Sequence, residues 1–117
     1  MVGIIGAMEE EVRELIEDMT ECEMQERASM KFYKGMLYGK EAVVVQSGIG
    51  KVNAAICTQI LADFYQVDRL INTGVAGSLD AEINIGDIVV STDAVCQRIG
   101  RSCRTGAAYG CICISGR

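Results

Sequence analysis

The stretch VGIIGAMEEEV at residues 2–12 contains an apolar run, a glycine and three consecutive glutamates. Residues 2–6 are short, apolar and end in glycine, which is typical of a buried parallel strand. The apolar residues that follow recur at i, i+3, i+4 and i+7, and they are Val12, Leu15, Ile16 and Met19. This spacing predicts a helix that begins near Glu9 and holds its glutamates in the first turn, where the helix macrodipole favours anions.

Two further patterns predict a hairpin and a second helix. Residues 31–38 and 41–46 are rich in aromatic residues, Val or Leu and flank a turn at residues 39–40, which is typical of a β-hairpin. A second helix is expected over about residues 51–65, because apolar residues recur there at helical spacing. These residues are Val52, Ala55, Ile56 and Ile60.

The last patterned segment completes an alternation of strands and helices. Leu70 and Ile71 end a strand that leads into a loop of small residues at 72–78, and residues 87–91 form one more strand. Strands that alternate with helices indicate an α/β fold with substantial parallel pairing. We therefore expect a mixed sheet flanked by helices.

Length and charge exclude several classes of protein. The chain has 117 residues, with 11 Lys and Arg against 16 Asp and Glu, so its net charge is −5. An acidic balance disfavours a nucleic-acid partner, and the length fits one modest domain. No apolar run approaches the roughly 20 residues that span a bilayer, and the first residues become acidic too early for a secretory signal. We expect a soluble, cytoplasmic protein without a membrane or nucleic-acid partner.

The composition changes after Val95. Residues 1–95 carry a net charge of −9, whereas residues 96–117 contain four Arg and no acidic residue. Four of the six cysteines lie in this tail, namely Cys96, Cys103, Cys111 and Cys113. Their spacing lacks a Cys-x2-Cys knuckle, which disfavours zinc, and a cytoplasmic context disfavours disulfides. We expect unpaired thiols, and we divide the chain into a domain part at 1–95 and an atypical tail at 96–117.

Three loops follow predicted strands, at residues 7–11, 47–51 and 72–78. The carboxyl ends of parallel strands meet at one edge of a sheet, which is where open α/β folds bind small molecules. One glutamate there could act as a general base, or all three could be solvated charges at a helix start; helical spacing lets at most two face one cleft. The loop at 47–51 lacks the spacing of a P-loop and the third glycine of a dinucleotide fingerprint, so a structural turn and a ligand loop both remain open.

Histidine and tryptophan are absent from the chain. This absence excludes a Ser-His-Asp or Cys-His catalytic arrangement and any histidine-ligated metal. We expect neither a metal nor a cofactor.

Four motifs together resemble the bacterial 5′-methylthioadenosine/S-adenosylhomocysteine nucleosidases. They occur in the order and spacing of that family over about 95 residues: GIIGAMEEEV at 3–12, SGIGKVNAA at 47–55, INTGVAGSL at 71–79 and GDIVVSTDAV at 86–95. The resemblance implies a nucleoside phosphorylase/hydrolase fold and a homodimer. The implied reaction cleaves the N-glycosidic bond of a nucleoside, releases adenine and a thioribose, and serves methionine salvage.

The resemblance also implies roles for individual residues. Glu11 would be the general base that orients and deprotonates the attacking water. Ala7 and Met8 would line the ribose and alkylthio region, and Ile49 would contact the alkylthio group. Val75, Ala76 and Gly77 would lie along the ribose and the nucleophilic water. Many relatives carry Ser where this chain has Val75, so a hydrogen bond to the ribose or water is expected to be missing.

The family's remaining site residues belong to its C-terminal half. The resemblance implies that an aspartate there protonates adenine and that a Met-Glu pair binds the ribose. The family pattern stops after Val95, so we expect that this half is missing, through a frameshift, a premature stop or a gene-model error, and that the 117-residue chain has little or no activity. The alternatives are a purine nucleoside phosphorylase of the same fold and a non-enzymatic nucleoside-binding or dimerisation fragment.

Overall fold

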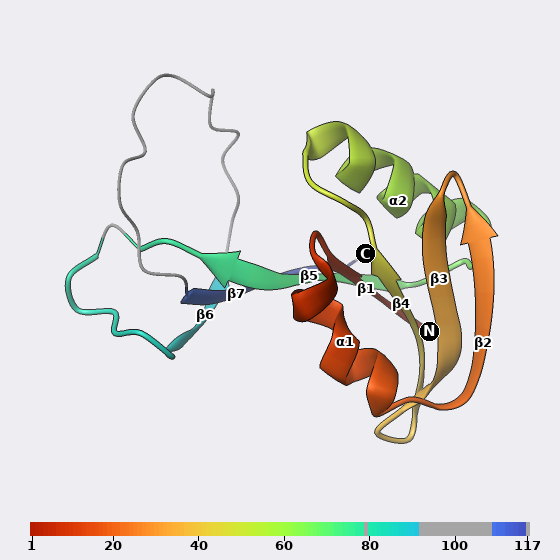
Figure 1. Cartoon of the computed structure of the whole chain (residues 1–117), viewed down its shortest axis with the longest axis horizontal. Coiled ribbons are helices and arrows are strands. Elements are labelled where there is room, and N and C mark those ends of the chain that lie inside the picture. The colour runs from red at the N-terminus through yellow and green to blue at the C-terminus, as the bar shows by residue number, and fades with distance from the viewer. Residues whose placement is uncertain (79, 92–108, 117) are drawn as a thin grey trace.

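The structure is a computed structural model that describes residues 1–78, 80–91 and 109–116, the last range by its backbone alone. Its elements, in chain order, are β1 (Val2–Gly6), α1 (Glu9–Glu17), β2 (Thr20–Arg27), β3 (Met30–Leu37), β4 (Lys40–Gln46), α2 (Lys51–Asp63), β5 (Arg69–Ala76), β6 (Ile88–Ser91) and β7 (Tyr109–Gly116). All the strands join one sheet in the order β2-β3-β4-β1-β5-β7-β6 (Figure 1). In these ranges, neither helix has the length and apolar character needed to cross a lipid bilayer.

Strand β1 lies at the centre of the parallel part of the sheet. It pairs in parallel with β4, where Gly6 is opposite Gln46, and with β5, where Ile5 is opposite Asn72. Its residues Gly3 to Gly6 are all buried, as expected for a strand covered on both faces. The carboxyl ends of β1, β4 and β5 therefore meet at one edge of the sheet.

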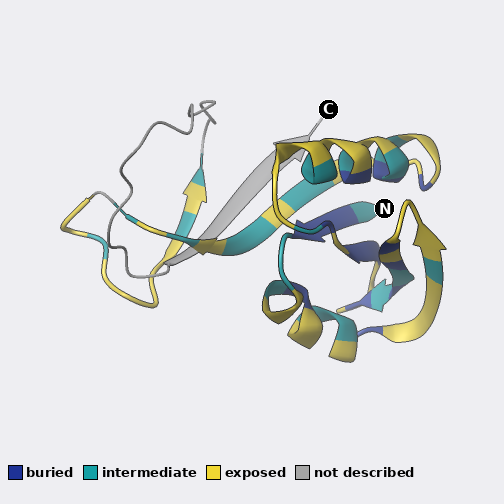
Figure 2. Cartoon of the chain, turned by 45° about the horizontal axis from the view of Figure 1, so that its top comes forward, coloured by how far each residue is buried: buried dark blue, intermediate teal, exposed yellow. Residues whose placement is uncertain are grey.

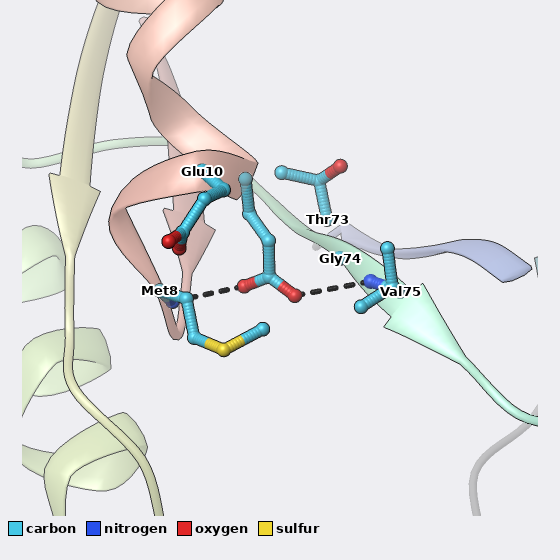
Figure 3. A pocket seen from close by; sticks show the side chains of 6 residues that line it. Met8, Glu10, Thr73, Gly74 and Val75 are labelled. Carbon is cyan, nitrogen blue, oxygen red and sulfur yellow. Dashed lines mark hydrogen bonds between the residues drawn. The ribbon is translucent and has the colours of Figure 1, made fainter. Parts of the chain in front are cut away.

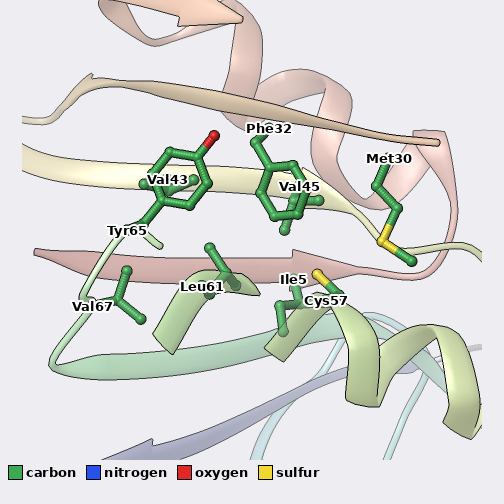
Figure 4. Packing of buried hydrophobic residues seen from close by; sticks show 9 residues of the cluster. All are labelled: Ile5, Met30, Phe32, Val43, Val45, Cys57, Leu61, Tyr65 and Val67. Atoms are coloured by element: carbon green, nitrogen blue, oxygen red, sulfur yellow. The ribbon is translucent and has the colours of Figure 1, made fainter. Parts of the chain in front are cut away.

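The two helices cover opposite faces of this sheet (Figure 1). On the α2 face, Cys57 and Leu61 pack against strand residues and the segment after the helix (Figure 4). On the α1 face, Val12 and Met19 are buried with Ile4 and other strand residues, and Leu15 and Ile16 pack at the margin of that cluster. The buried stripe predicted for the first helix is therefore confirmed, as is the mixed sheet flanked by helices.

The predicted hairpin is also confirmed. Strands β3 and β4 pair antiparallel, with Leu37 opposite Lys40. The two residues between them, Tyr38 and Gly39, both have positive φ, at 49° and 77°. Positive φ at both central positions is the geometry that matches the twist of a two-residue hairpin, and glycine adopts it without strain.

The second helix is confirmed as α2, but most of the apolar residues whose spacing predicted it do not face the core. The structure buries Cys57 and Leu61 completely, whereas Val52 is 73% exposed and Ile56 is 42% exposed. Figure 2 shows the outer side of α2 as exposed and its inner side as buried. Helix α2 is apolar on several sides, so its periodicity does not distinguish the face that contacts the sheet from the face that does not.

The sequence patterns did not predict strands β2 and β7. They also predicted a loop from Asn72 where the structure continues strand β5. Strand β2 is an edge strand of mostly exposed, charged residues, which lack the alternation of a half-buried strand. Strand β5 continues to Ala76, through residues expected to begin a loop at Asn72. Pairing explains this extension, because β7 lies antiparallel to β5 along its whole length. Of the tail cysteines, Cys96 and Cys103 lie outside the described residues.

Candidate active site

Glu11 is fixed at the start of α1 by the loop that leaves β1. It occupies the third position of the helix, and its Oε2 atom accepts hydrogen bonds from the backbone N–H groups of Ala7 at 2.7 Å and Met8 at 3.0 Å. A glutamate at this position that bonds back to the N-cap N–H is a known helix-start arrangement, because it satisfies donors that the helix leaves unpaired. These two bonds explain why the chain turns from strand to helix here.

The second oxygen of Glu11 makes a bond that helix capping does not explain. The backbone N–H of Val75, on β5, donates to Oε1 at 3.0 Å, across 64 residues of sequence. An ionised carboxylate has about four acceptor sites, two on each oxygen. From the residues that the structure describes, Oε2 accepts two hydrogen bonds and Oε1 one, which leaves Oε1 an acceptor site for a further donor.

A pocket of about 430 Å³ opens beside this carboxylate (Figure 3). Its volume lies within the range of small-molecule sites. Two segments line it, from the start of α1 and from β5: Met8, Glu10, Glu11, Thr73, Gly74 and Val75. Of the three glutamates, Glu10 and Glu11 face the pocket and Glu9 does not, as the helical spacing allows. Among the described residues, the lining contains two carboxylates and neither lysine nor arginine.

The structure brings together some of the residues singled out from the sequence. Met8, Glu11 and Val75 line the pocket, and Ala7 takes part through its N–H group. Val75 contributes its backbone N–H to Glu11 while its side chain is 53% exposed, so the bond to Glu11 does not depend on a serine at this position. Ala76 and Gly77, at the end of β5, are not part of the pocket wall.

The glycine loop between β4 and α2 reaches the same edge of the sheet. The N–H of Ser47 donates to the carbonyl of Gly6 at 2.9 Å, which ties this loop to the end of β1. Gly48 and Gly50 have positive φ, and the side-chain amide of Asn53 donates to the Ile49 carbonyl at 3.0 Å. These features are those of a structural turn. The Ile49 side chain is 77% exposed and does not line the pocket, so its contact with an alkylthio group stays a prediction.

Sequence reasoning missed three residues of the pocket, Glu10, Thr73 and Gly74. Gly74 belongs to the small-residue segment that was expected to admit a ligand, but nothing in the sequence distinguishes it from the neighbouring glycine. Within residues 1–78, 80–91 and 109–116, no group of three or more His, Cys, Asp or Glu side chains is placed to hold a metal ion.

Comparison with known proteins identifies the family of this chain. The family model of the phosphorylase superfamily matches residues 1–110. Among curated proteins, the 5′-methylthioadenosine/S-adenosylhomocysteine nucleosidase of Staphylococcus carnosus is 52% identical over 94 residues, which are 80% of this chain and 41% of that protein. The resemblance seen in the four sequence motifs is therefore confirmed.

Solved structures agree with this result. The nucleosidase of S. pneumoniae with a transition-state inhibitor is 41% identical, has a TM-score of 0.73 and is matched over 76% of this chain and 39% of its own. The nucleosidase of Colwellia psychrerythraea in complex with adenine is 42% identical, has a TM-score of 0.72 and is matched over 92% of this chain and 48% of its own.

The chain spans about two fifths of the length of the curated relatives that it matches, 41% of one and 37% of another. Within that span, the fold agrees with the motifs: the parallel strands β1 and β5 and the first helix, which carries Glu11, lie at the residues where the motifs predict them. On the match of the family model to residues 1–110, the chain belongs to the phosphorylase superfamily.

Proposed function

We propose that the enzyme of which this chain forms a part hydrolyses the N-glycosidic bond of 5′-methylthioadenosine and S-adenosylhomocysteine, with Glu11 as the base that positions and deprotonates water, and that the 117-residue chain alone has little activity. The observation that carries this proposal is the Glu11 carboxylate. It is held by three backbone N–H groups from two separate segments, and it keeps one acceptor site on Oε1 beside a pocket.

The proposed reaction follows from that geometry. A water molecule donates one hydrogen bond to the open site of Oε1, and its oxygen attacks the anomeric carbon of the ribose. The bond to adenine breaks through an oxocarbenium-like state, the water proton passes to Glu11, and the bonding electrons leave with the base. Adenine takes up a proton as it departs, from an aspartate that the resemblance places in the family's C-terminal half.

The other site residues keep the roles that the resemblance implies. Ala7 and Met8 lie on the ribose and alkylthio side, Ile49 contacts the alkylthio group, and Val75, Ala76 and Gly77 follow the ribose and the water. In support, the N–H groups of Ala7, Met8 and Val75 already hold the reacting carboxylate.

Hydrolysis is favoured over phosphorolysis by the charge of the pocket. A phosphorylase must hold a phosphate dianion, which Arg, Lys or a helix N-terminus usually binds. The described lining contains Glu10 and Glu11 and no basic residue. Two carboxylates would repel phosphate, whereas neutral water is compatible with them.

Methionine salvage, a cytoplasmic location and a homodimer complete the proposal. Methionine salvage rests on the resemblance, and the cytoplasmic location rests on the sequence, in which we find neither a bilayer-spanning apolar run nor a secretory signal. A homodimer has support from the outer face of α2, where Val52 and Ile56, one helical turn apart, are 73% and 42% exposed. Apolar side chains gathered on one helix face are typical of a protein-protein interface.

A chimeric enzyme tests the proposed activity. Residues 1–95 are joined to the remaining part of the Staphylococcus carnosus nucleosidase, and adenine release from 5′-methylthioadenosine is measured without phosphate. We expect turnover, and we expect Glu11→Gln to lower it by about 10²–10⁴-fold, the usual contribution of a general base. Glu9→Gln is the matched control, because this neighbouring glutamate is exposed and does not line the pocket.

Other outcomes distinguish the alternatives. Cleavage that requires phosphate would assign a purine nucleoside phosphorylase, and binding of adenosine analogues without cleavage would assign a non-enzymatic nucleoside-binding module. Full activity of the Glu11→Gln chimera would refute the role of Glu11. For the 117-residue chain by itself we expect little adenine release, because the resemblance assigns the adenine-protonating aspartate to none of the four motifs.

A further inference from the structure

We propose that Gly74 is a positioning residue whose missing side chain fixes where the Glu11 carboxylate lies. The inference rests on the proposed role of Glu11 and adds to it a residue of β5 that makes no polar side-chain contact of its own. Gly74 lines the pocket between Thr73 and Val75, directly against the carboxylate (Figure 3).

The Glu11 carboxylate lies too close to Gly74 to leave room for a side chain there. A Cβ atom built on Gly74 would lie 2.5 Å from Oε1, 3.0 Å from Cδ and 3.3 Å from Oε2 of Glu11. Carbon and oxygen atoms that are not bonded do not approach to 2.5 Å without repulsion, so any side chain at position 74 requires a movement. The carboxylate therefore occupies the space that a side chain would fill.

Backbone conformation does not account for glycine at this position. Among the glycines that the structure describes, positive φ occurs at Gly39, Gly48, Gly50 and Gly86 and not at Gly74. Alanine is compatible with an extended strand, so steric contact with Glu11 is the reason to exclude it.

The backbone of β5 cannot easily retreat from such a contact. Gly74 is opposite Cys111 of β7, and Val75 is opposite Gly110, within an unbroken antiparallel register. The Glu11 side chain is the more mobile partner, because it has three rotatable bonds. An added methyl group would therefore push the carboxylate away from the Val75 N–H, and the open acceptor site on Oε1 would move with it.

A double-mutant cycle tests this inference without relying on catalysis. The 117-residue chain and its variants Gly74→Ala, Glu11→Ala and Glu11→Ala/Gly74→Ala are compared by thermal unfolding and by hydrogen exchange of the Val75 amide. We expect Gly74→Ala to lower the unfolding midpoint when Glu11 is present and not to lower it when residue 11 is alanine. In the second case the clash is gone, and replacing glycine by alanine restricts the unfolded chain.

Gly6→Ala is the matched control. A Cβ atom on Gly6 would lie 2.5 Å from Cγ1 of Val12 and 3.1 Å from Cβ of Glu11, and both of these close atoms remain in the Glu11→Ala variant, whereas Oε2 of Glu11, which is lost, lies at an ordinary contact distance of 3.5 Å. The fall in midpoint caused by Gly6→Ala should therefore be the same in both backgrounds. Equal effects of Gly74→Ala in the two backgrounds would overturn the proposal.

The Val75 amide gives an independent readout that does not require a cooperative transition. In Gly74→Ala this amide should exchange faster, to the extent seen in Glu11→Ala, since both changes remove its acceptor. An unchanged exchange rate in Gly74→Ala would refute displacement of the carboxylate. If the cycle shows coupling but the chimeric enzyme is inactive, only the proposed function fails; if the chimera depends on Glu11 but the cycle is additive, only the role of Gly74 fails.

Discussion

Burial separates the chemistry of the two cysteines in the first 95 residues. Cys57 is fully buried between α2 and the sheet, and burial raises the pKa of its thiol from 9.0 to about 12. Cys22, on the edge strand β2, is exposed. Because the thiolate is the reactive form, these two positions should respond very differently to an alkylating reagent.

At pH 8 we expect iodoacetamide to modify Cys57 at least about 100-fold more slowly than Cys22, as measured by mass spectrometry of the two peptides. Unfolding in urea should bring the rates together, which serves as the control. The raised pKa also means that folding favours the protonated thiol, so the contribution of Cys57 to stability is lost as the pH rises from about 9 towards 12. Similar rates in the native chain would contradict the burial of Cys57.

Three residues of the site differ in how much of their role could be predicted from the sequence. The sequence pattern predicted that at most two of the three glutamates face a cleft, and the family resemblance singled out Glu11 among them. Gly74 could not be predicted, because its importance depends on a carboxylate 63 positions earlier that only the fold brings beside it. Val75 was considered for its side chain, whereas the structure uses its backbone N–H.

Among the elements, β3, β4 and α1 are predicted well because their apolar patterns have one interpretation. Helix α2 was placed correctly along the chain, but its pattern did not indicate which face is buried, because apolar residues surround the helix. Strand β2 was missed because an edge strand with one paired side can consist mainly of charged residues. Local patterns therefore predicted the elements whose buried residues form a clear apolar run or stripe, including β4, which is buried on both faces of the sheet.

Helix α2 leads to a prediction about association. If its outer face forms the proposed homodimer, Val52→Lys should shift the chain to monomer, because an ammonium group would be buried in an apolar contact. Sedimentation velocity measures the change across a range of concentrations. Glu14→Gln, on the exposed face of α1, changes the charge equally and should leave association unchanged. A chain that is monomeric before substitution would refute the dimer.

At the scale of the whole molecule, burial is unevenly distributed. Where side chains are described, the buried core residues lie between Ile4 and Val67, and residues 69–91 include none. Figure 2 shows the far part of β5 and β6 as exposed or intermediate, away from the two helices. Among the described strands, β6 has β7 as its single neighbour in the sheet. The chain thus consists of a packed core and an arm held by backbone pairing.

This division predicts that the arm can be lost while the core is kept. Ile112 is opposite Thr73 of β5 and Val90 of β6, so β7 is paired on both sides at this residue. Ile112→Pro removes the backbone N–H and places a ring in a central strand, a position that proline rarely occupies. We expect the amides of β6 to exchange at least about 10-fold faster, while those of β1 and β4 keep their protection. Ile112→Val keeps the N–H and should preserve protection throughout, whereas equal loss in β1 and β6 would show that core and arm unfold as one unit.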